Sequence, residues 1–120
     1  MQTVLTVDDS RVMRDLLKRA LEPAGFRVLQ AIDGADGLRV LETERPDVII
    51  TDINMPVMDG FELIEAVRAD ASRPRVPILV LSTESDSAKK ARARSAGATG
   101  WIVKPFQPET LVQAIRRVAA

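Results

Sequence analysis

Five short apolar runs alternate with segments of helical spacing along this chain of 120 residues, and the alternation limits the folds that it can adopt. The apolar runs cover residues 4–7, 26–31, 48–51, 78–81 and 100–103. Short apolar runs bounded by turn residues are typical of buried strands. Strands that alternate repeatedly with helices favour a parallel sheet with helices on both faces. We therefore predict an α/β fold.

The position of each strand in the sheet follows from its polarity. The runs at 4–7, 48–51 and 78–81 are almost continuously apolar, so we expect them at the centre. The run at 26–31 includes Arg27 and Gln30, as an edge strand would. A chain of this length forms one domain, and no linker or low-complexity segment interrupts residues 1–120.

Start and stop signals bound the predicted helices. Ser10 or Asp9 is expected to cap the first helix, which Pro23 and Gly25 end, and the last helix begins at Pro108. The second and third are expected at about 33–44 and 59–70. The residues predicted to face the core are Val12, Met13, Leu16, Leu17, Ala20 and Leu21, then Ala35, Leu38 and Leu41, then Phe61, Ile64 and Val67, then Leu111, Ala114, Ile115 and Val118.

The fourth predicted helix, at about 85–95, differs from the others. Because alanine buries little apolar area, this helix is expected to be weakly anchored. Its basic face has two interpretations, a solvated surface or a mobile surface that binds a partner. The residues expected to face inward are Ala88, Ala91 and Ser95, and those of the basic face are Lys89, Lys90, Arg92 and Arg94.

Composition excludes several classes of function. Lys plus Arg equals Asp plus Glu, 17 of each, so global charge does not indicate nucleic acid or a membrane surface. The sequence has no cysteine and no histidine, which excludes disulfides, thiolate or imidazole metal ligands, and histidine-activated nucleophiles. No apolar run approaches the roughly 20 residues of a membrane span, and no leader precedes the first run. We expect a cytoplasmic monomer.

Polar residues follow four of the five predicted strands. Since the carboxyl ends of parallel strands lie at one edge of the sheet, where ligands bind, these side chains should converge. Asp8 and Asp9 follow the first strand and Asp52 the third. Ser82 and Thr83 follow the fourth strand, and Lys104 follows the fifth.

Three converging carboxylates require compensation. Two unit charges about 4 Å apart repel by roughly 4 kcal/mol at an effective dielectric near 20. Either protons or a cation must relieve this repulsion. Oxygen ligands without imidazole select a hard ion, Mg²⁺ before Ca²⁺, with Mn²⁺ as a substitute. Pro56 and Val57 interrupt any calcium-loop pattern after Asp52, and the sequence has no glycine-rich nucleotide-binding motif.

A divalent ion beside Lys104 suits phosphoryl transfer, because both neutralise phosphoryl oxygens. With no histidine available, a carboxylate is the best-placed nucleophile. Asp52, alone after the central strand, is our candidate. Asp8 and Asp9 are the candidate metal holders.

These motifs closely resemble the receiver domains of two-component response regulators over essentially the whole chain. The resemblance rests on Asp8-Asp9, the segment Asp-Ile-Asn-Met-Pro-Val-Met-Asp-Gly at 52–60, Ser82 and Lys104-Pro105-Phe106, in that order. It implies the flavodoxin-like (βα)5 fold, with five parallel strands in the order 2-1-3-4-5.

The resemblance also implies a role for each site residue. Asp52 accepts a phosphoryl group from a histidine kinase. Asp9, Asp52 and the backbone carbonyl of Asn54 bind Mg²⁺, and Asp8 acts mainly through water. Lys104 contacts Asp52 and then the phosphoryl group, and the bond between Lys104 and Pro105 is expected to be cis.

Further implied roles concern the response to phosphorylation. Ser82 hydrogen-bonds the phosphoryl oxygens, and Trp101 then turns inward, which alters the face formed by the fourth helix, fifth strand and fifth helix. Receivers usually carry threonine at the first of these positions and tyrosine or phenylalanine at the second. Asn54 and Glu84 occupy positions that tune hydrolysis of the phosphoryl group. The partner face is expected at Lys89, Lys90, Arg92, Arg94 and Trp101.

The leading functional hypothesis is a stand-alone receiver that binds a target protein, such as a flagellar motor switch in chemotaxis, without direct contact with nucleic acid. Alternatives are a receiver cut from a multidomain transcriptional regulator, a phosphorelay intermediate and a degenerate scaffold. From another class, a metal-dependent phosphatase could use Asp52 as nucleophile. Such enzymes usually place an acid two residues later, where this chain has Asn54.

Overall fold

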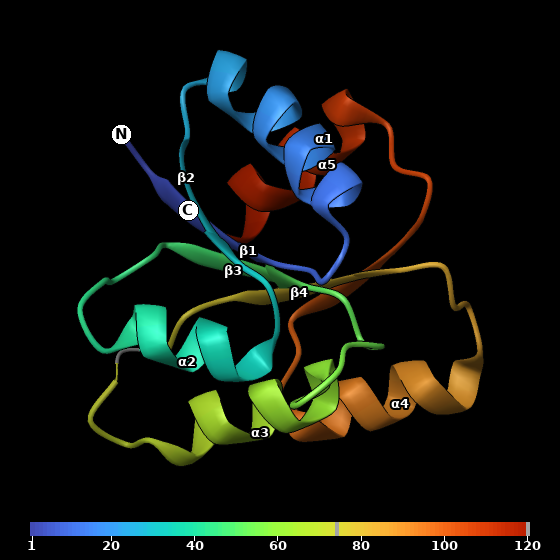
Figure 1. Ribbon diagram of the computed structural model, residues 1–120. Helices are drawn as coiled ribbons and strands as arrows, with labels where there is room; N and C mark the ends of the chain where they lie inside the picture. Colours follow the sequence, from blue (N-terminus) through green and yellow to red (C-terminus); the bar gives the residue numbers. More distant parts are fainter. Residues whose placement is uncertain (74, 120) are drawn as a thin grey trace.

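A computed structural model describes residues 1–73 and 75–119 (Figure 1). In these residues strands and helices alternate along the chain. The strands are β1 Thr3–Val7, β2 Arg27–Ala31, β3 Val48–Thr51, β4 Ile78–Ser82 and β5 Gly100–Val103. The helices are α1 Arg11–Leu21, α2 Gly34–Leu41, α3 Gly60–Ala69, α4 Ser87–Ala96 and α5 Pro108–Val118, and a short 3-10 turn, η1 Glu22–Ala24, follows α1.

The strands form one parallel sheet in the order β2-β1-β3-β4-β5. Helices α1 and α5 cover one face, and α2, α3 and α4 cover the other (Figure 1). Each face has its own apolar cluster, one around Leu17, Leu21 and Ile115 and the other around Phe61 and Ile64. The predicted fold class and strand order are confirmed.

The polarity of the strands explains their order. Every residue of β3 and β4 is buried, whereas Arg27 and Gln30 of the edge strand β2 are exposed. Each strand begins and ends within one residue of its predicted bounds. No helix within the described residues has both the length and the apolar character that crossing a membrane requires.

Side-chain caps define where the helices start. Ser10 accepts a hydrogen bond from the backbone of Met13 at the start of α1, as predicted. Asp59 caps α3, and Glu62 bonds back to the backbone of Asp59 to complete a capping box. Pro108 occupies the first turn of α5, where a missing N–H does no harm.

The predicted inward face of α1 is partly wrong. Leu17 and Leu21 are buried, but Val12 is 69% exposed and Leu16 is 45% exposed. Neighbouring residues lie about 100° apart around a helix, so a stripe this wide cannot face the sheet at all its positions. Leu16 instead lines an open groove with Phe106 and Pro108 of the segment that leads into α5.

The inward faces of α2 and α4 also differ from the prediction. Ala35 is exposed, and the buried positions of α2 are Gly34, Gly37 and Leu41. A Cβ at Gly37 would lie 3.3 Å from Val7, so the absence of a side chain lets α2 pack closely on β1.

In α4 the expected inward residues, Ala88, Ala91 and Ser95, are exposed, and Ala93 is buried instead. The guanidinium of Arg92 lies 4.0 Å from the centre of the Phe61 ring, a cation–π contact with α3. The apolar packing of α4 is weak, as predicted, because alanine buries little apolar area. The contact of Arg92 with Phe61 adds a polar attachment to α3.

Val57, in the loop between β3 and α3, has a strained backbone. Its φ is +70°, which β-branched residues rarely adopt, and the N–H of Met58 bonds to the carbonyl of Pro56 across it. The Val57 side chain is 83% exposed, so packing offsets little of this strain.

We predict that Val57→Asn raises the free energy of unfolding by about 1 kcal/mol, because asparagine tolerates positive φ. Urea denaturation measures the change. Val57→Ile, which keeps the β-branch, is the control and should give no gain. A loss of stability in the asparagine variant would contradict the strain argument.

Candidate functional site

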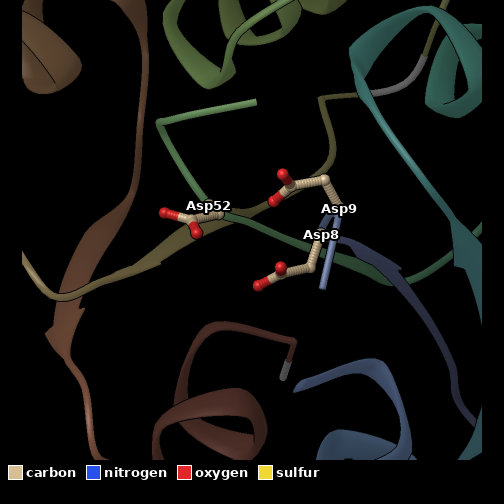
Figure 2. Close-up of side chains that lie close together, drawn as sticks. All are labelled: Asp8, Asp9 and Asp52. Carbon is tan, nitrogen blue, oxygen red and sulfur yellow. The ribbon is translucent and has the colours of Figure 1, made fainter. Parts of the chain in front are cut away.

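Three carboxylates meet at the carboxyl ends of the central strands. Asp8 and Asp9 follow β1, and Asp52 follows β3, its neighbour in the sheet. Each offers an oxygen within 4.8 Å of the others. Figure 2 shows the three side chains together, two from the segment after β1 and one from the end of β3. The parallel topology has brought together acids 44 positions apart in sequence, and Asp8 and Asp9 differ in exposure, the first buried and the second exposed.

Lys104 reaches this cluster from the edge strand β5. Its Nζ lies 2.9 Å from Oδ2 of Asp52 and 3.0 Å from Oδ2 of Asp8. Its backbone N–H donates to the carbonyl of Ser82, which ties the start of the β5–α5 loop to the end of β4. The peptide bond between Lys104 and Pro105 is cis. One ammonium therefore bridges carboxylates from two different strands.

Backbone hydrogen bonds hold the segment that carries Asp8. The N–H of Asp8 donates to the carbonyl of Ala31 at the end of β2, and Oδ1 of Asp8 accepts from the N–H of Ser10. The guanidinium of Arg14 donates to the carbonyl of Asp8. The first turn of α1 therefore fixes both the main chain and the side chain of Asp8.

Close backbone packing fixes the loop after Asp52. A Cβ at Gly60 would lie 2.8 Å from the Cα of Ile53, so only glycine fits there. The N–H of Gly34 donates to the carbonyl of Met58, which joins the same loop to α2.

Burial and pairing shift the pKa of two groups in the cluster. Burial raises the pKa of Asp8 above the ordinary carboxyl value of 3.8, although hydrogen bonds from Ser10 and Lys104 oppose this. Burial alone would lower the pKa of Lys104, but hydrogen bonds to Asp52 and Asp8 and their charges outweigh it and raise this pKa. The Lys104 ammonium therefore stays charged at neutral pH. Burial destabilises the ionised form of Asp8 relative to an Asp8 exposed to water.

A divalent cation fits this donor set. The acids are oxygen ligands without a competing imidazole or thiolate, as hard ions require. Burial is the main cause of the raised pKa of Asp8, and the charge of Asp52 adds a smaller contribution in the same direction. Additional positive charge would relieve their repulsion.

Ser82, Glu84 and Trp101 form a connected group beside the acids. The buried hydroxyl of Ser82 accepts a hydrogen bond of 3.2 Å from the N–H of Glu84. The indole Nε1 of Trp101 donates to the carbonyl of Glu84 over 2.9 Å. The β4–α4 loop is thus held at successive backbone atoms by a hydroxyl from β4 and an indole from β5.

The predicted partner face is only partly free. Lys89 pairs with Glu84, and Arg92 stacks on Phe61. Lys90 is half-buried and Arg94 is exposed. Trp101 is half-buried, and Asn54 is exposed in the loop after Asp52.

Sequence reasoning missed two supporting residues and one contact. Arg14 binds the Asp8 carbonyl and the Thr51 hydroxyl donates to the carbonyl of Asp52. Lys89 was predicted only as part of the partner face, and its pairing with Glu84 was missed. A threonine beside the candidate nucleophile is a weak signal that could have been weighed. The other two contacts depend on helix placement, which spacing alone does not give.

The raised pKa of Asp8 predicts a stabilising substitution. Its folded-state pKa lies above 3.8, so stability falls as pH rises from 3.8 through that pKa. Asp8→Asn removes the ionisation, so its stability should exceed that of the parent above this window. We expect a gain of about 0.5–2 kcal/mol at pH 7, by urea denaturation without divalent ions.

Asp15→Asn on the exposed face of α1 is the matched control and should leave stability unchanged. Two results would contradict the claim that the ionised form of Asp8 destabilises the fold. One is an Asp8→Asn variant that is less stable than the parent at pH 7. The other is a gain in the free energy of unfolding that does not diminish towards pH 3.

Sequence comparisons identify a family. Residues 4–116 match the model of the response regulator receiver domain. The transcriptional regulatory protein PrrA of Mycobacterium tuberculosis is 42% identical over 117 residues, which cover 98% of this chain and 48% of the relative. The chain spans about half the length of the curated relatives it matches.

Solved structures agree with this match. The chemotaxis protein CheY4 of Vibrio cholerae is 47% identical, with a TM-score of 0.93 and 98% of each chain covered. The receiver domain of the sensor histidine kinase PA1611 from Pseudomonas aeruginosa PAO1, solved with a magnesium ion coordinated in its active-site cleft, is 30% identical. Its TM-score is 0.90, with 98% of this chain and 97% of that chain covered. The chain belongs to the family of response regulator receiver domains.

Proposed function

We propose that this protein is a phosphorylation switch that accepts a phosphoryl group on Asp52. Receiver domains take phosphoryl groups from histidine kinases and pass the signal to downstream effectors. The observation that carries the proposal is the bridge from Lys104 to Asp52 and Asp8 beside the exposed acid Asp9. The candidate nucleophile Asp52, the ammonium of Lys104 and carboxylates that can bind a metal ion thus lie close together, as phosphoryl transfer requires.

In the transfer step, an oxygen of Asp52 attacks phosphorus in line with the leaving group. The bond from phosphorus to the imidazole nitrogen of the donor's phosphohistidine breaks, its electron pair leaves with the imidazole, and an acyl phosphate forms on Asp52. Lys104 stays within reach of the phosphoryl oxygens and offsets their charge. It is already charged and placed, so little reorganisation accompanies the reaction.

Receiver domains bind Mg²⁺ through a cluster of acidic residues, and Asp8, Asp9 and Asp52 form such a cluster here. We assign Asp9, Asp52 and the backbone carbonyl of Asn54 as direct ligands, and Asp8 as a ligand through water. When bound, the ion supplies positive charge to the phosphoryl oxygens. Mn²⁺ is the expected substitute, because it also prefers oxygen ligands.

Phosphorylation would alter the hydrogen bonds of the β4–α4 loop. A phosphoryl group adds about −1.5 to −2 charge and strong acceptor oxygens, which attract the Ser82 hydroxyl. That movement removes the acceptor of the Glu84 N–H and so releases the main chain of Glu84. A shift of this main chain that breaks the hydrogen bond from the Trp101 indole then lets Trp101 turn inward. The surface formed by α4, β5 and α5 changes as a result, because α4 has little apolar anchorage.

The proposed switch could act in either of two processes, chemotaxis or transcriptional regulation. The likeness to CheY4 over 98% of both chains supports binding of a target protein in chemotaxis. The PrrA relatives, of which this chain matches about half, support a role as the receiver of a transcriptional regulator. We favour target-protein binding through the α4–β5–α5 surface, a mode that serves both outputs.

The decisive experiment is incubation with acetyl phosphate or phosphoramidate and Mg²⁺, followed by mass spectrometry of the intact protein. We expect the mass of one phosphoryl group to be added, and none in Asp52→Asn, because the amide is a poor nucleophile. Asp59→Asn, in the same loop but acting as the cap of α3, is the matched control and should still be labelled.

Labelling that persists in Asp52→Asn would contradict the proposal. Steady hydrolysis of a phosphomonoester by the purified protein would favour the aspartyl phosphatase instead. We expect no such turnover, because Asn54 occupies the position where those enzymes carry a general acid.

A further inference from the structure

The carboxylate of Glu84 is held by a residue of α4. Nζ of Lys89 lies 2.8 Å from Oε1 of Glu84, and their side chains are 40% and 31% exposed. Lys89 stands in the first turn of α4, five residues after Glu84. The contact therefore joins the β4–α4 loop to α4, which is part of the surface that we propose binds the target protein.

The main chain of Glu84 is fixed as well. Its N–H donates to the hydroxyl of Ser82, and its carbonyl accepts from Nε1 of Trp101. With the Lys89 contact, three different residues hold Glu84 at its backbone and its carboxylate. These contacts define the position of Glu84.

The Glu84 carboxylate also faces the loop that follows Asp52. The pKa of Glu84 is lowered first by the hydrogen bond and charge of Lys89 and to a smaller extent by Asn54, whereas desolvation and the charge of Asp86 oppose the shift. Asn54 stands two residues after Asp52, and Glu84 two residues after Ser82. Glu84 thus lies between α4 and the loop beside the phosphoryl position.

We propose that Lys89 is a positioning residue that lengthens the lifetime of the phosphoryl group by holding Glu84 across the edge of the site. The proposal rests on phosphorylation of Asp52. In hydrolysis, a water oxygen attacks phosphorus, the bond to the Asp52 oxygen breaks with its electron pair on the carboxylate, and inorganic phosphate leaves with the protons of the water. A fixed Glu84 restricts the approach of that water.

This arrangement gives α4 an effect on the chemistry as well as on partner binding. An acidic group of a target protein that bound Lys89 would compete with Glu84 and loosen it. Target binding and phosphoryl lifetime would then be linked through one ion pair. Because both side chains are partly exposed, the pair is weak and a few-fold change in rate is the expected size.

The test is the rate of dephosphorylation after removal of the phosphodonor, in Mg²⁺ and followed by intact mass. We expect Lys89→Gln to lose the phosphoryl group two- to fivefold faster than the parent, and Lys89→Arg to restore the parent rate. Lys18→Gln, at an exposed lysine of α1, is the matched control and should have no effect. Glu84→Gln should be as fast as Lys89→Gln.

The double variant Lys89→Gln with Glu84→Gln distinguishes positioning from a general structural effect. Since Lys89 acts through Glu84, the double variant should be no faster than Glu84→Gln alone. Raising the salt concentration should accelerate the parent more than Lys89→Gln, because salt screens only an intact pair.

Additive effects of the two substitutions, or an unchanged rate in Lys89→Gln, would overturn this inference while the assignment of Asp52 stood. Absence of labelling at Asp52 in the parent would instead overturn the proposed function, and this inference with it.

Discussion

The structure depends on one electrostatic imbalance, three carboxylates at the ends of two central strands against a single ammonium. Lys104 touches two of the acids, Asp8 and Asp52, and burial, with a smaller contribution from the charge of Asp52, keeps the pKa of Asp8 raised. The fold sustains this imbalance because the core beneath it is rigid: every residue of β3 and β4 is buried. A divalent cation would relieve the repulsion among these carboxylates, and the proposed phosphoryl transfer to Asp52 would use the same group of charges.

The helices on the two faces of the sheet are held in different ways. On one face α1 fixes Asp8 through Ser10 and Arg14, so the segment that carries Asp8 and Asp9 is held firmly. On the other face α4 has one fully buried apolar residue, Ala93, and depends on polar contacts such as that of Arg92 with Phe61. Polar contacts of this kind can exchange partners at little net change in free energy. The rigid layer therefore suits chemistry, and the weakly packed layer suits a change of surface.

Much of the fold and of the site could be predicted from sequence, for a physical reason. Strand positions follow from apolar runs such as 48–51, and parallel strands must end at one edge, so Asp8, Asp52 and Lys104 had to converge. The orientation of the helices could not be predicted as well, because an apolar stripe such as that of Val12 to Leu21 is wider than the surface of the sheet available to it. Contacts at glycines, such as Gly60 against Ile53, and pairs such as Lys89 with Glu84 depend on how helices and loops finally dock, which spacing does not determine.

An experimental structure of the protein with Mg²⁺ and beryllofluoride, a phosphoryl analogue, tests the central claim most directly. The account predicts beryllium bound to an oxygen of Asp52, fluoride within hydrogen-bond reach of Lys104 and Ser82, and Mg²⁺ on Asp9, Asp52 and the Asn54 carbonyl. Beryllofluoride on another residue, or Mg²⁺ bound away from the three acids, would contradict it.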